Sequence, residues 1–337
     1  MKSLTLIKIG ALGDIVRTSY LVNALKIKFN YHITWITDTS AFDLLKNNPN
    51  IDELIESNSE MPSETDLLLC LEDQYEYVNL GSKIKSKKII GSYIDNNNLI
   101  SYTQDCNEWF DMSLISKNGI DEADILKKNN KLSFNKIFSK ILNLELADIK
   151  AKIYTDKEKD EKYLAKKNKS IKLIGLNLFA GKRWPSKEIT ADTANNLVLS
   201  ISKYLDSENL NHRFILFCDN SNLDKVDNIV SLNKNILMKN TGASVLDFSA
   251  LIKSCDYIIT TDSLGMHLAI ANNINHLSFF SPTSAEEIDT FGYGIKVSST
   301  SDDYCTYKAH TDNSSLSYNR LFDFWLKHTK NIGWYIK

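Results

Sequence analysis

The sequence lacks the marks of several protein classes. None of its apolar runs reaches the roughly 18 residues that a membrane-spanning helix needs. Its 40 basic and 42 acidic residues nearly balance, so the excess positive charge of proteins that bind nucleic-acid phosphates is missing. Its five cysteines are scattered and odd in number, which fits neither a zinc motif nor a disulfide framework. We expect a cytoplasmic protein with reduced thiols and no nucleic-acid partner.

Two motifs of nucleotide-binding proteins are also missing. No G-x-G-x-x-G run occurs, so the usual dinucleotide-binding fingerprint is absent. No Asp-x-Asp sequence occurs either, and carboxylate pairs of that kind commonly hold Mg²⁺ on a diphosphate. The sequence therefore predicts no metal site and no resident cofactor.

The chain does contain strand-like and helix-like patterns in alternation, and the alternation occurs twice. The strand-like segments of the first half are 4–9, 31–37, 66–71 and 88–91. A Lys- and Glu-rich stretch lies between residues 151 and 170, and the alternation restarts after it. Strands that alternate with helices predict parallel sheets in a doubly wound fold. Because 337 residues have room for two domains, we predict an α/β protein with two such domains facing one cleft.

A turn with two glycines, residues 10–14, lies between the first strand and the first helix. Ligands of open α/β sheets bind beyond the carboxyl ends of strands, where such turns lie. The turn ends in Gly13 and Asp14, close to the expected start of the helix. Two interpretations of Asp14 follow: a helix cap that satisfies free backbone N–H groups, or a functional carboxylate at a ligand site.

Three turns of the second half follow buried strands and would meet at one edge of the second sheet. In residues 177–185, the adjacent cations Lys182 and Arg183 suit an anionic ligand such as a diphosphate, or are simply solvated. Residues 261–267 begin a helix whose first N–H groups can bind an anion. Residues 281–283 repeat this situation after the next strand. We favour a nucleotide site at this edge.

Within the second of these turns, two residues have structural alternatives. Asp262 can cap the following helix instead of serving a ligand. His267 can be a core histidine with its hydrogen bonds satisfied.

Together these segments resemble glycosyltransferase family 9, the ADP-heptose:lipopolysaccharide heptosyltransferases. The segments that carry the resemblance are the Gly13-Asp14 turn, Lys182-Arg183-Trp184-Pro185, residues 241–263, His267-Leu268-Ala269 and Phe280-Ser281-Pro282-Thr283. Their order and spacing match over most of the chain, and the second half is the more specific. One departure is that Leu264 stands where the family's loop usually has glycine, and Gly265 follows it.

The resemblance implies a GT-B architecture, with two Rossmann-like domains and the donor nucleotide held mainly by the second. We place these domains at residues 1–155 and 165–320, with residues 321–337 packing back on the first. Asp14 corresponds to the family's general base, and Lys182 to the cation that meets the donor phosphates. The other donor-site residues that we carry over are Gly13, Asn177, Arg183, Asp219, Ala243, Asp262, Ser263, Leu264, Gly265, Met266, His267 and Thr283.

The resemblance also implies a reaction. We expect an inverting, metal-independent transferase that moves a sugar, by preference a heptose, from an ADP-sugar to a hydroxyl of a surface glycan such as the lipopolysaccharide inner core. The ADP-sugar is then a co-substrate, the acceptor partner is a glycan or glycolipid, and any contact with the inner membrane is peripheral. Three alternatives stay open: a nucleotide-sugar epimerase, a non-catalytic nucleotide-binding relative, and transfer to a protein acceptor.

The acceptor side of the molecule departs from the family pattern. Family members that act on the anionic inner core have basic residues in the first domain, whereas residues 1–150 hold 17 basic and 21 acidic residues. The local basic cluster of this half is Lys83, Lys85, Lys87 and Lys88. It either contacts the acceptor or forms a solvated face.

Overall fold

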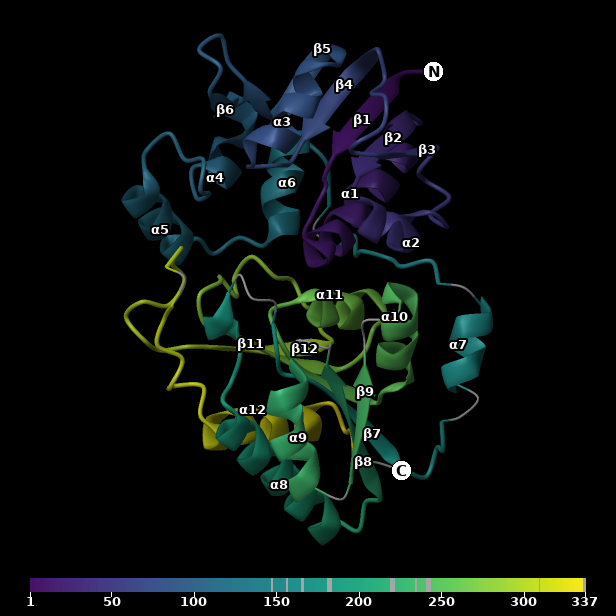
Figure 1. Cartoon of the computed structure of the whole chain (residues 1–337), viewed down its shortest axis with the longest axis vertical. Helices are drawn as coiled ribbons and strands as arrows, with labels where there is room; N and C mark the ends of the chain where they lie inside the picture. Colours follow the sequence, from purple (N-terminus) through teal and green to yellow (C-terminus); the bar gives the residue numbers. More distant parts are fainter. Residues whose placement is uncertain are drawn as a thin grey trace. The chain divides into compact units, whose positions relative to one another are not determined.

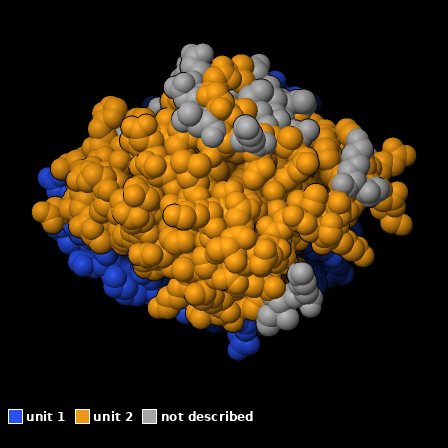
Figure 2. Space-filling model, turned by 90° about the horizontal axis from the view of Figure 1, so that it is seen from below, with its two compact units in different colours: residues 1–154, 286–289 blue, residues 155–285, 290–337 orange. Residues whose placement is uncertain are grey.

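The structure is a computed structural model of the chain. It describes residues 1–146, 148–155, 157–164, 167–180, 184–218, 222–233, 235–240, 244–308 and 310–335. The chain divides into two units, coloured separately in Figure 2. Unit 1 comprises residues 1–154 and 286–289, and unit 2 comprises residues 155–285 and 290–337.

Unit 1 is a six-stranded sheet with helices (Figure 1). Its strands are β1 (Ser3–Ile7), β2 (His32–Thr37), β3 (Glu53–Glu56), β4 (Glu64–Cys70), β5 (Lys85–Ile94) and β6 (Ile100–Tyr102). Its helices are α1 (Leu12–Phe29), α2 (Phe42–Leu45), α3 (Tyr75–Ser82), α4 (Asn107–Phe110), α5 (Ile120–Asn129) and α6 (Phe134–Leu142). The strand order is β3-β2-β1-β4-β5-β6, and all neighbours are parallel except β6 on β5.

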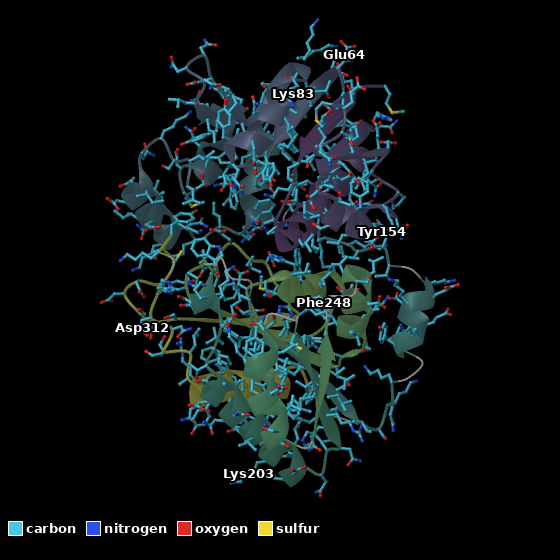
Figure 3. The ribbon with its side chains drawn as sticks, in the orientation of Figure 1. Glu64, Lys83, Tyr154, Lys203, Phe248 and Asp312 are labelled. Atoms are coloured by element: carbon cyan, nitrogen blue, oxygen red, sulfur yellow. The ribbon has the colours of Figure 1, made fainter. Side chains whose placement is uncertain are left out.

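Unit 2 repeats this arrangement with a fully parallel sheet in the order β12-β11-β10-β7-β8-β9. Its strands are β7 (Lys172–Asn177), β8 (His212–Cys218), β9 (Ile236–Asn240), β10 (Tyr257–Thr261), β11 (His276–Phe280) and β12 (Gly294–Ser298). Its helices are α7 (Lys157–Leu164), α8 (Ala191–Ser207), α9 (Leu223–Leu232), α10 (Val245–Ser254), α11 (Leu264–Ala271) and α12 (Tyr318–Asn331). Phe248 of α10, labelled in Figure 3, packs edge-on against Phe217 of β8.

Each sheet has a point at which the chain changes direction across it. In unit 1 the chain moves outward from β1 through β2 to β3, then returns to add β4 on the other side of β1. In unit 2 it moves from β7 through β8 to β9, then adds β10 on the other side of β7. Ligands of doubly wound sheets bind beyond the carboxyl ends of the strands at such switch points. The loops after β1 and β4, and those after β7 and β10, are therefore the places to look for a site.

The C-terminal helix α12 belongs to unit 2. Trp325 of α12 is fully buried and lies edge-on to Tyr204 of α8, beside which α12 runs in Figure 1. Beyond α12, the carbonyl oxygen of Trp334 accepts a hydrogen bond from Lys172 Nζ at the start of β7 (2.9 Å). The aromatic face of α12 is therefore buried against unit 2 itself, and the expectation that residues 321–337 pack back on the first domain stays a prediction.

Candidate active site

Two charged residues anchor the backbone that leads from β1 to α1. Lys8 follows β1 and Glu72 follows β4, so they lie on either side of the switch point of unit 1. Lys8 Nζ lies 3.2 Å from Glu72 Oε1, and the Ile9 N–H donates to the same carboxylate. Burial raises the pKa of Glu72, against the lowering effect of the Lys8 ammonium. The indole N–H of Trp35 holds the Lys8 carbonyl (3.0 Å), so the turn before α1 begins from a fixed point.

Asp14 lies in the first turn of α1 and does not cap it. The helix begins at Leu12 with Ala11 as its N-cap, so Gly13 and Asp14 are already helical. The interpretation of Asp14 as a helix cap is therefore wrong. Its carboxylate instead accepts a hydrogen bond from Arg17 Nη2, 2.8 Å from Oδ1. The Asp14 side chain stays 38% exposed, so a substrate can reach it.

Aromatic rings surround the other side of this arginine. The Arg17 guanidinium carbon lies 4.5 Å from the ring centroid of Phe134 and 5.6 Å from that of Trp109. Cations attract ring faces at these distances. Arg17 is only 16% exposed, and its Nη1 lies 3.8 Å from Glu287 Oε2.

In unit 2, Asn177 joins the ends of two neighbouring strands at the switch point. Its side-chain N–H groups donate to Thr260 Oγ1 (2.9 Å) and to Ser263 Oγ (2.7 Å). A Cβ atom on Gly265 would lie 2.4 Å from Asn177 Nδ2, closer than any real contact. The glycine is therefore required at 265 because the Asn177 amide fills the space over the first turn of α11.

Asp262 follows β10 and pairs with a lysine from the turn after β7. Lys187 Nζ donates to Asp262 Oδ2 (2.8 Å) and to the Asp262 carbonyl oxygen (2.9 Å), while Thr261 Oγ1 donates to the Lys187 carbonyl (2.6 Å). Burial disfavours the charged form of Asp262. The Lys187 ammonium, with smaller contributions from His267 and Thr283, outweighs this and holds the pKa of Asp262 well below its usual range. Asp262 is thus an ion-pair partner, and the N-cap of α11 is the next residue along the chain.

The remaining residues of α11 have different placements. Ser263 is the N-cap, but its hydroxyl makes no capping bond. Leu264 is half-buried, whereas Met266 is fully buried and so contributes its side chain to the core. His267 is also buried, as the core interpretation expects, yet it acts electrostatically on Asp262. Thr283, which follows β11, acts on the same carboxyl.

The structure thus gathers one group of the expected residues at the switch point of unit 2. This group consists of Asn177, Asp262, Ser263, Gly265, His267 and Thr283. Asp14 and Gly13 lie in the corresponding region of unit 1. Four further expected residues, Lys182, Arg183, Asp219 and Ala243, lie outside the described residues.

Sequence reasoning missed two residues that the structure places at these points. Arg17 carries a usable signal, because a basic residue three positions after an acidic one on a helix forms an ion pair across one turn. Lys187 has no such sequence signal, since its partner Asp262 lies 75 residues away along the chain.

Two further observations concern cofactors and membranes. Among the described residues, no three His, Cys, Asp or Glu side chains gather in a way that could hold a metal ion. A search of the same residues for a helix that is long and apolar enough to cross a membrane finds none.

Comparison with known proteins places this chain in a family. The family model for glycosyltransferase family 9 (heptosyltransferase) matches residues 109–318, which is more than half of the chain. The chain belongs to glycosyltransferase family 9. It is accordingly a glycosyltransferase, and the family resemblance of the sequence motifs is confirmed. No curated protein matches the chain at a significant level.

Solved structures of other family 9 enzymes share the fold. A family 9 glycosyltransferase from Veillonella parvula DSM 2008 has a TM-score of 0.71 and 16% identity, with 98% of each chain covered. The E. coli ADP-heptose LPS heptosyltransferase II has a TM-score of 0.65 and 11% identity, covering 99% of this chain and 100% of its own. The E. coli heptosyltransferase WaaC with ADP has a TM-score of 0.61 and 11% identity, covering 97% and 100%. The predicted α/β fold of GT-B type, with two largely parallel sheets, is confirmed.

Proposed function

We propose that this enzyme transfers a heptose from ADP-heptose to a hydroxyl of a glycan such as the lipopolysaccharide inner core, with inversion and without a metal ion. The observation that carries the proposal is the Asp14 carboxylate, which is partly exposed beyond β1 at the switch point of its sheet and is held by Arg17. Membership of family 9 supports it, as does the likeness of fold to the E. coli heptosyltransferases. We propose that the reaction takes place in the cytoplasm.

In this reaction the acceptor oxygen attacks the anomeric carbon of the heptose while the bond to ADP breaks. Asp14 takes the proton of the acceptor hydroxyl, and its negative charge favours the positive charge that develops on the sugar. The electron pair of the broken bond leaves with the diphosphate. No step of this scheme needs a metal ion.

Unit 2 supplies the environment of the leaving group in this proposal. The start of α11 presents backbone N–H groups beside Asn177, and a helix N-terminus stabilises a diphosphate as it gains negative charge. By the family resemblance of their motif, we assign Lys182 and Arg183 the role of adding positive charge at the diphosphate. The Lys187–Asp262 pair ties the turn after β7 to the end of β10, so that the two sides of the diphosphate site are fixed relative to each other.

Replacing Asp14 tests the proposal directly. For Asp14→Asn we expect ADP affinity, measured by calorimetry, to stay unchanged, and ADP release from ADP-heptose to fall about 10²–10⁴-fold, since general bases contribute that much. Asp43→Asn is the matched control, because Asp43 pairs with Lys46 three residues later on the exposed surface of the same unit. Full turnover by Asp14→Asn would refute the proposal. Failure of the wild-type protein to release ADP from the donor would favour a non-catalytic relative.

Chelation tests the metal-independent part. We expect the rate of ADP release from ADP-heptose in excess EDTA to equal the rate without it. The reason is that positive side chains and helix termini, rather than an ion, face the leaving group in the proposed scheme. A rate that falls on chelation and returns with added Mg²⁺ would contradict this part alone.

A further inference from the structure

We infer that Arg17 is the positioning residue of the reaction: its guanidinium orients the Asp14 carboxylate so that one oxygen is ready to accept a proton. This inference rests on the proposed role of Asp14 as the base. Its starting point is the 2.8 Å hydrogen bond between Arg17 Nη2 and Asp14 Oδ1, one helical turn apart on α1. A base must hold one oxygen within hydrogen-bond reach of the proton that it removes, so a fixed carboxylate orientation has a direct catalytic value.

The arginine itself is held far more firmly than an ordinary surface residue. The faces of Phe134 and Trp109 lie 4.5 and 5.6 Å from its guanidinium carbon. A second carboxylate, Glu287, lies 3.8 Å from Nη1. Glu287 is fixed in turn, because its carbonyl oxygen accepts the Phe134 N–H (2.9 Å) and its carboxylate lies 3.9 Å from Lys127 Nζ. These contacts hold the guanidinium in one orientation. Its hydrogen bond to Asp14 Oδ1 then orients the Asp14 carboxylate.

The segment that supplies Glu287 comes from the other half of the sequence. Residues 286–289 are the part of the C-terminal half that belongs to unit 1, and they reach the N-terminus of α6 through the Phe134 N–H. This segment affects the site, because it places a carboxylate near Arg17 Nη1, whereas Asp14 accepts from Nη2. With one acid at each of its two terminal nitrogens, Arg17 is held between Asp14 and Glu287.

A role in helix stability alone does not account for this arrangement. An exposed ion pair across one turn of a helix contributes little to stability, and such a pair needs no aromatic enclosure. The Arg17 Nε atom is buried and has no hydrogen-bond partner among the described residues. An unsatisfied buried N–H is destabilising, so the position is not optimised for stability. The geometry instead fixes the Arg17 guanidinium against one carboxylate oxygen of Asp14.

The electrostatic consequence follows from the charges that face Arg17. They are the carboxylates of Asp14 on α1 and of Glu287, together with the ammonium of Lys127 on α5, which faces Glu287. Tyr20, one turn further along α1, stays neutral because burial raises the pKa of its phenol well above the usual value. A guanidinium beside a carboxylate favours the ionised form. Removal of the Arg17 charge is therefore expected to raise the pH at which Asp14 binds a proton, while the loss of turnover at neutral pH comes from the lost orientation of the carboxylate.

Two variants of Arg17 separate positioning from stability. Arg17→Met removes the charge and keeps an apolar side chain between the rings, whereas Arg17→Lys keeps a charge and loses the planar fork. Arg320 is the matched control, since it also is half-buried and lies over a ring, that of Phe324, but on α12 of unit 2. Each variant is titrated in the whole protein by NMR with [γ-¹³C]aspartate, and the Asp14 signal is assigned by its absence from Asp14→Asn. ADP affinity and ADP release from ADP-heptose are measured on the same samples.

For Arg17→Met we expect the midpoint of the Asp14 titration to rise by about one pH unit or more. Turnover should fall at least about tenfold at neutral pH, while ADP affinity stays unchanged. For Arg17→Lys the midpoint should return toward the wild-type value while turnover stays reduced, because an ammonium does not reproduce the oriented contact. Arg320→Met should match the wild-type protein in every measurement.

Several outcomes overturn the inference. One is an Arg17→Met variant with the wild-type midpoint and turnover. Another is a loss of turnover that Arg320→Met shares. If Arg17→Met does not fold, Arg17→Lys decides, and full turnover by that variant overturns the inference. The two failures can be told apart. If the proposed function is wrong, Asp14→Asn keeps its turnover. If only this inference is wrong, Asp14→Asn is inactive and the Arg17 variants stay active. The titration needs no substrate, so it stands whichever donor the enzyme uses.

Discussion

At the scale of single residues, several of these assignments depend on pairs that only the fold brings together. Asn177 and Gly265 are 88 positions apart, yet the amide of one fills the space that a side chain on the other would need. Asp14 was identifiable from the sequence because it follows a strand and a glycine. Its partner Arg17 could also be predicted from the sequence, because it is a basic residue one helical turn after Asp14. The partner of Asp262 could not be predicted in this way, because the strand order of the folded sheet decides which loop lies beside the end of β10.

The Lys187–Asp262 pair makes a testable contribution to stability. Both side chains are mostly buried, with 15% and 12% exposure, so Lys187→Met leaves a carboxylate without its counter-charge. Variants of this kind lose about 3–5 kcal/mol of unfolding free energy. Urea unfolding at neutral pH measures this loss. Lys225→Met is the control, because the Lys225–Glu188 pair is half exposed at the lysine and should contribute at most about 1 kcal/mol.

The pH dependence of this loss has a definite sign. The folded-state pKa of Asp262 is lower than its unfolded value, so the ion pair stabilises the protein above the unfolded pKa, about 4, and this contribution disappears as the pH falls toward the folded pKa. We expect the difference between wild type and Lys187→Met to be largest near neutral pH and to shrink as the pH falls toward and below about 4, because the buried carboxyl of the variant, without its counter-charge, binds a proton before that of the wild type does. A difference that stays constant across this range would show that the lysine acts through packing instead.

At the scale of elements, central strands were predicted well and edge strands were not. The observed β2 and β4 largely coincide with the expected segments 31–37 and 66–71, because parallel strands buried on both faces are continuous apolar runs. By contrast, β3 and β12 are edge strands whose residues are mostly only half-buried, and they show no clear apolar run. The sequence of α12 shows an aromatic face but does not reveal which surface will cover it.

One small element, the turn of residues 185–187 after β7, depends on a distant loop. Asn313 Nδ2 donates to the carbonyl oxygens of Ser186 (3.2 Å) and Glu188 (2.5 Å), and the Thr311 N–H donates to Ser186 Oγ (2.8 Å). The turn adjoins the segment that holds Lys182, for which we propose contact with the donor diphosphate. The loop around residue 313 therefore braces one wall of the proposed nucleotide site.

Asn313→Ala tests this brace. Each lost hydrogen bond removes about 1 kcal/mol, so we expect ADP affinity by calorimetry to fall by up to about tenfold as the turn loosens. Asn272→Ala is the control, since Asn272 also makes two side-chain hydrogen bonds in unit 2, to Ser249 and Leu268, but away from the turn. Equal ADP affinities for the two variants would mean that the turn does not depend on Asn313 for its function.

At the scale of the whole molecule, charge is distributed so that the basic cluster of the first half lies away from the candidate base. Lys85 begins β5 and is in register with Glu64, the first residue of β4, while Lys87 Nζ is 2.6 Å from Asp66 Oδ1. Figure 3 shows Glu64 and Lys83 at one end of unit 1 and Tyr154 at the other. These lysines lie at the amino ends of the parallel strands, whereas Asp14 follows the carboxyl end of β1. The seven residues of β4 span about 20 Å between these two edges.

The two interpretations of that cluster therefore have different consequences. If it is a solvated face, replacing both Lys83 and Lys85 by glutamine leaves the sugar-transfer rate and the ADP affinity unchanged, because exposed substitutions away from a site alter free energies by less than about 0.5 kcal/mol. We expect this result, since the cluster lies at the wrong edge of the sheet for a residue that must meet an acceptor hydroxyl near Asp14. The measurement is transfer from ADP-heptose to a glycan acceptor, with Asp14→Asn as the inactive reference. A double variant that keeps its ADP affinity but needs a much higher acceptor concentration would instead assign the lysines to acceptor binding, and the acceptor would then have to be long enough to span the sheet from one edge to the other.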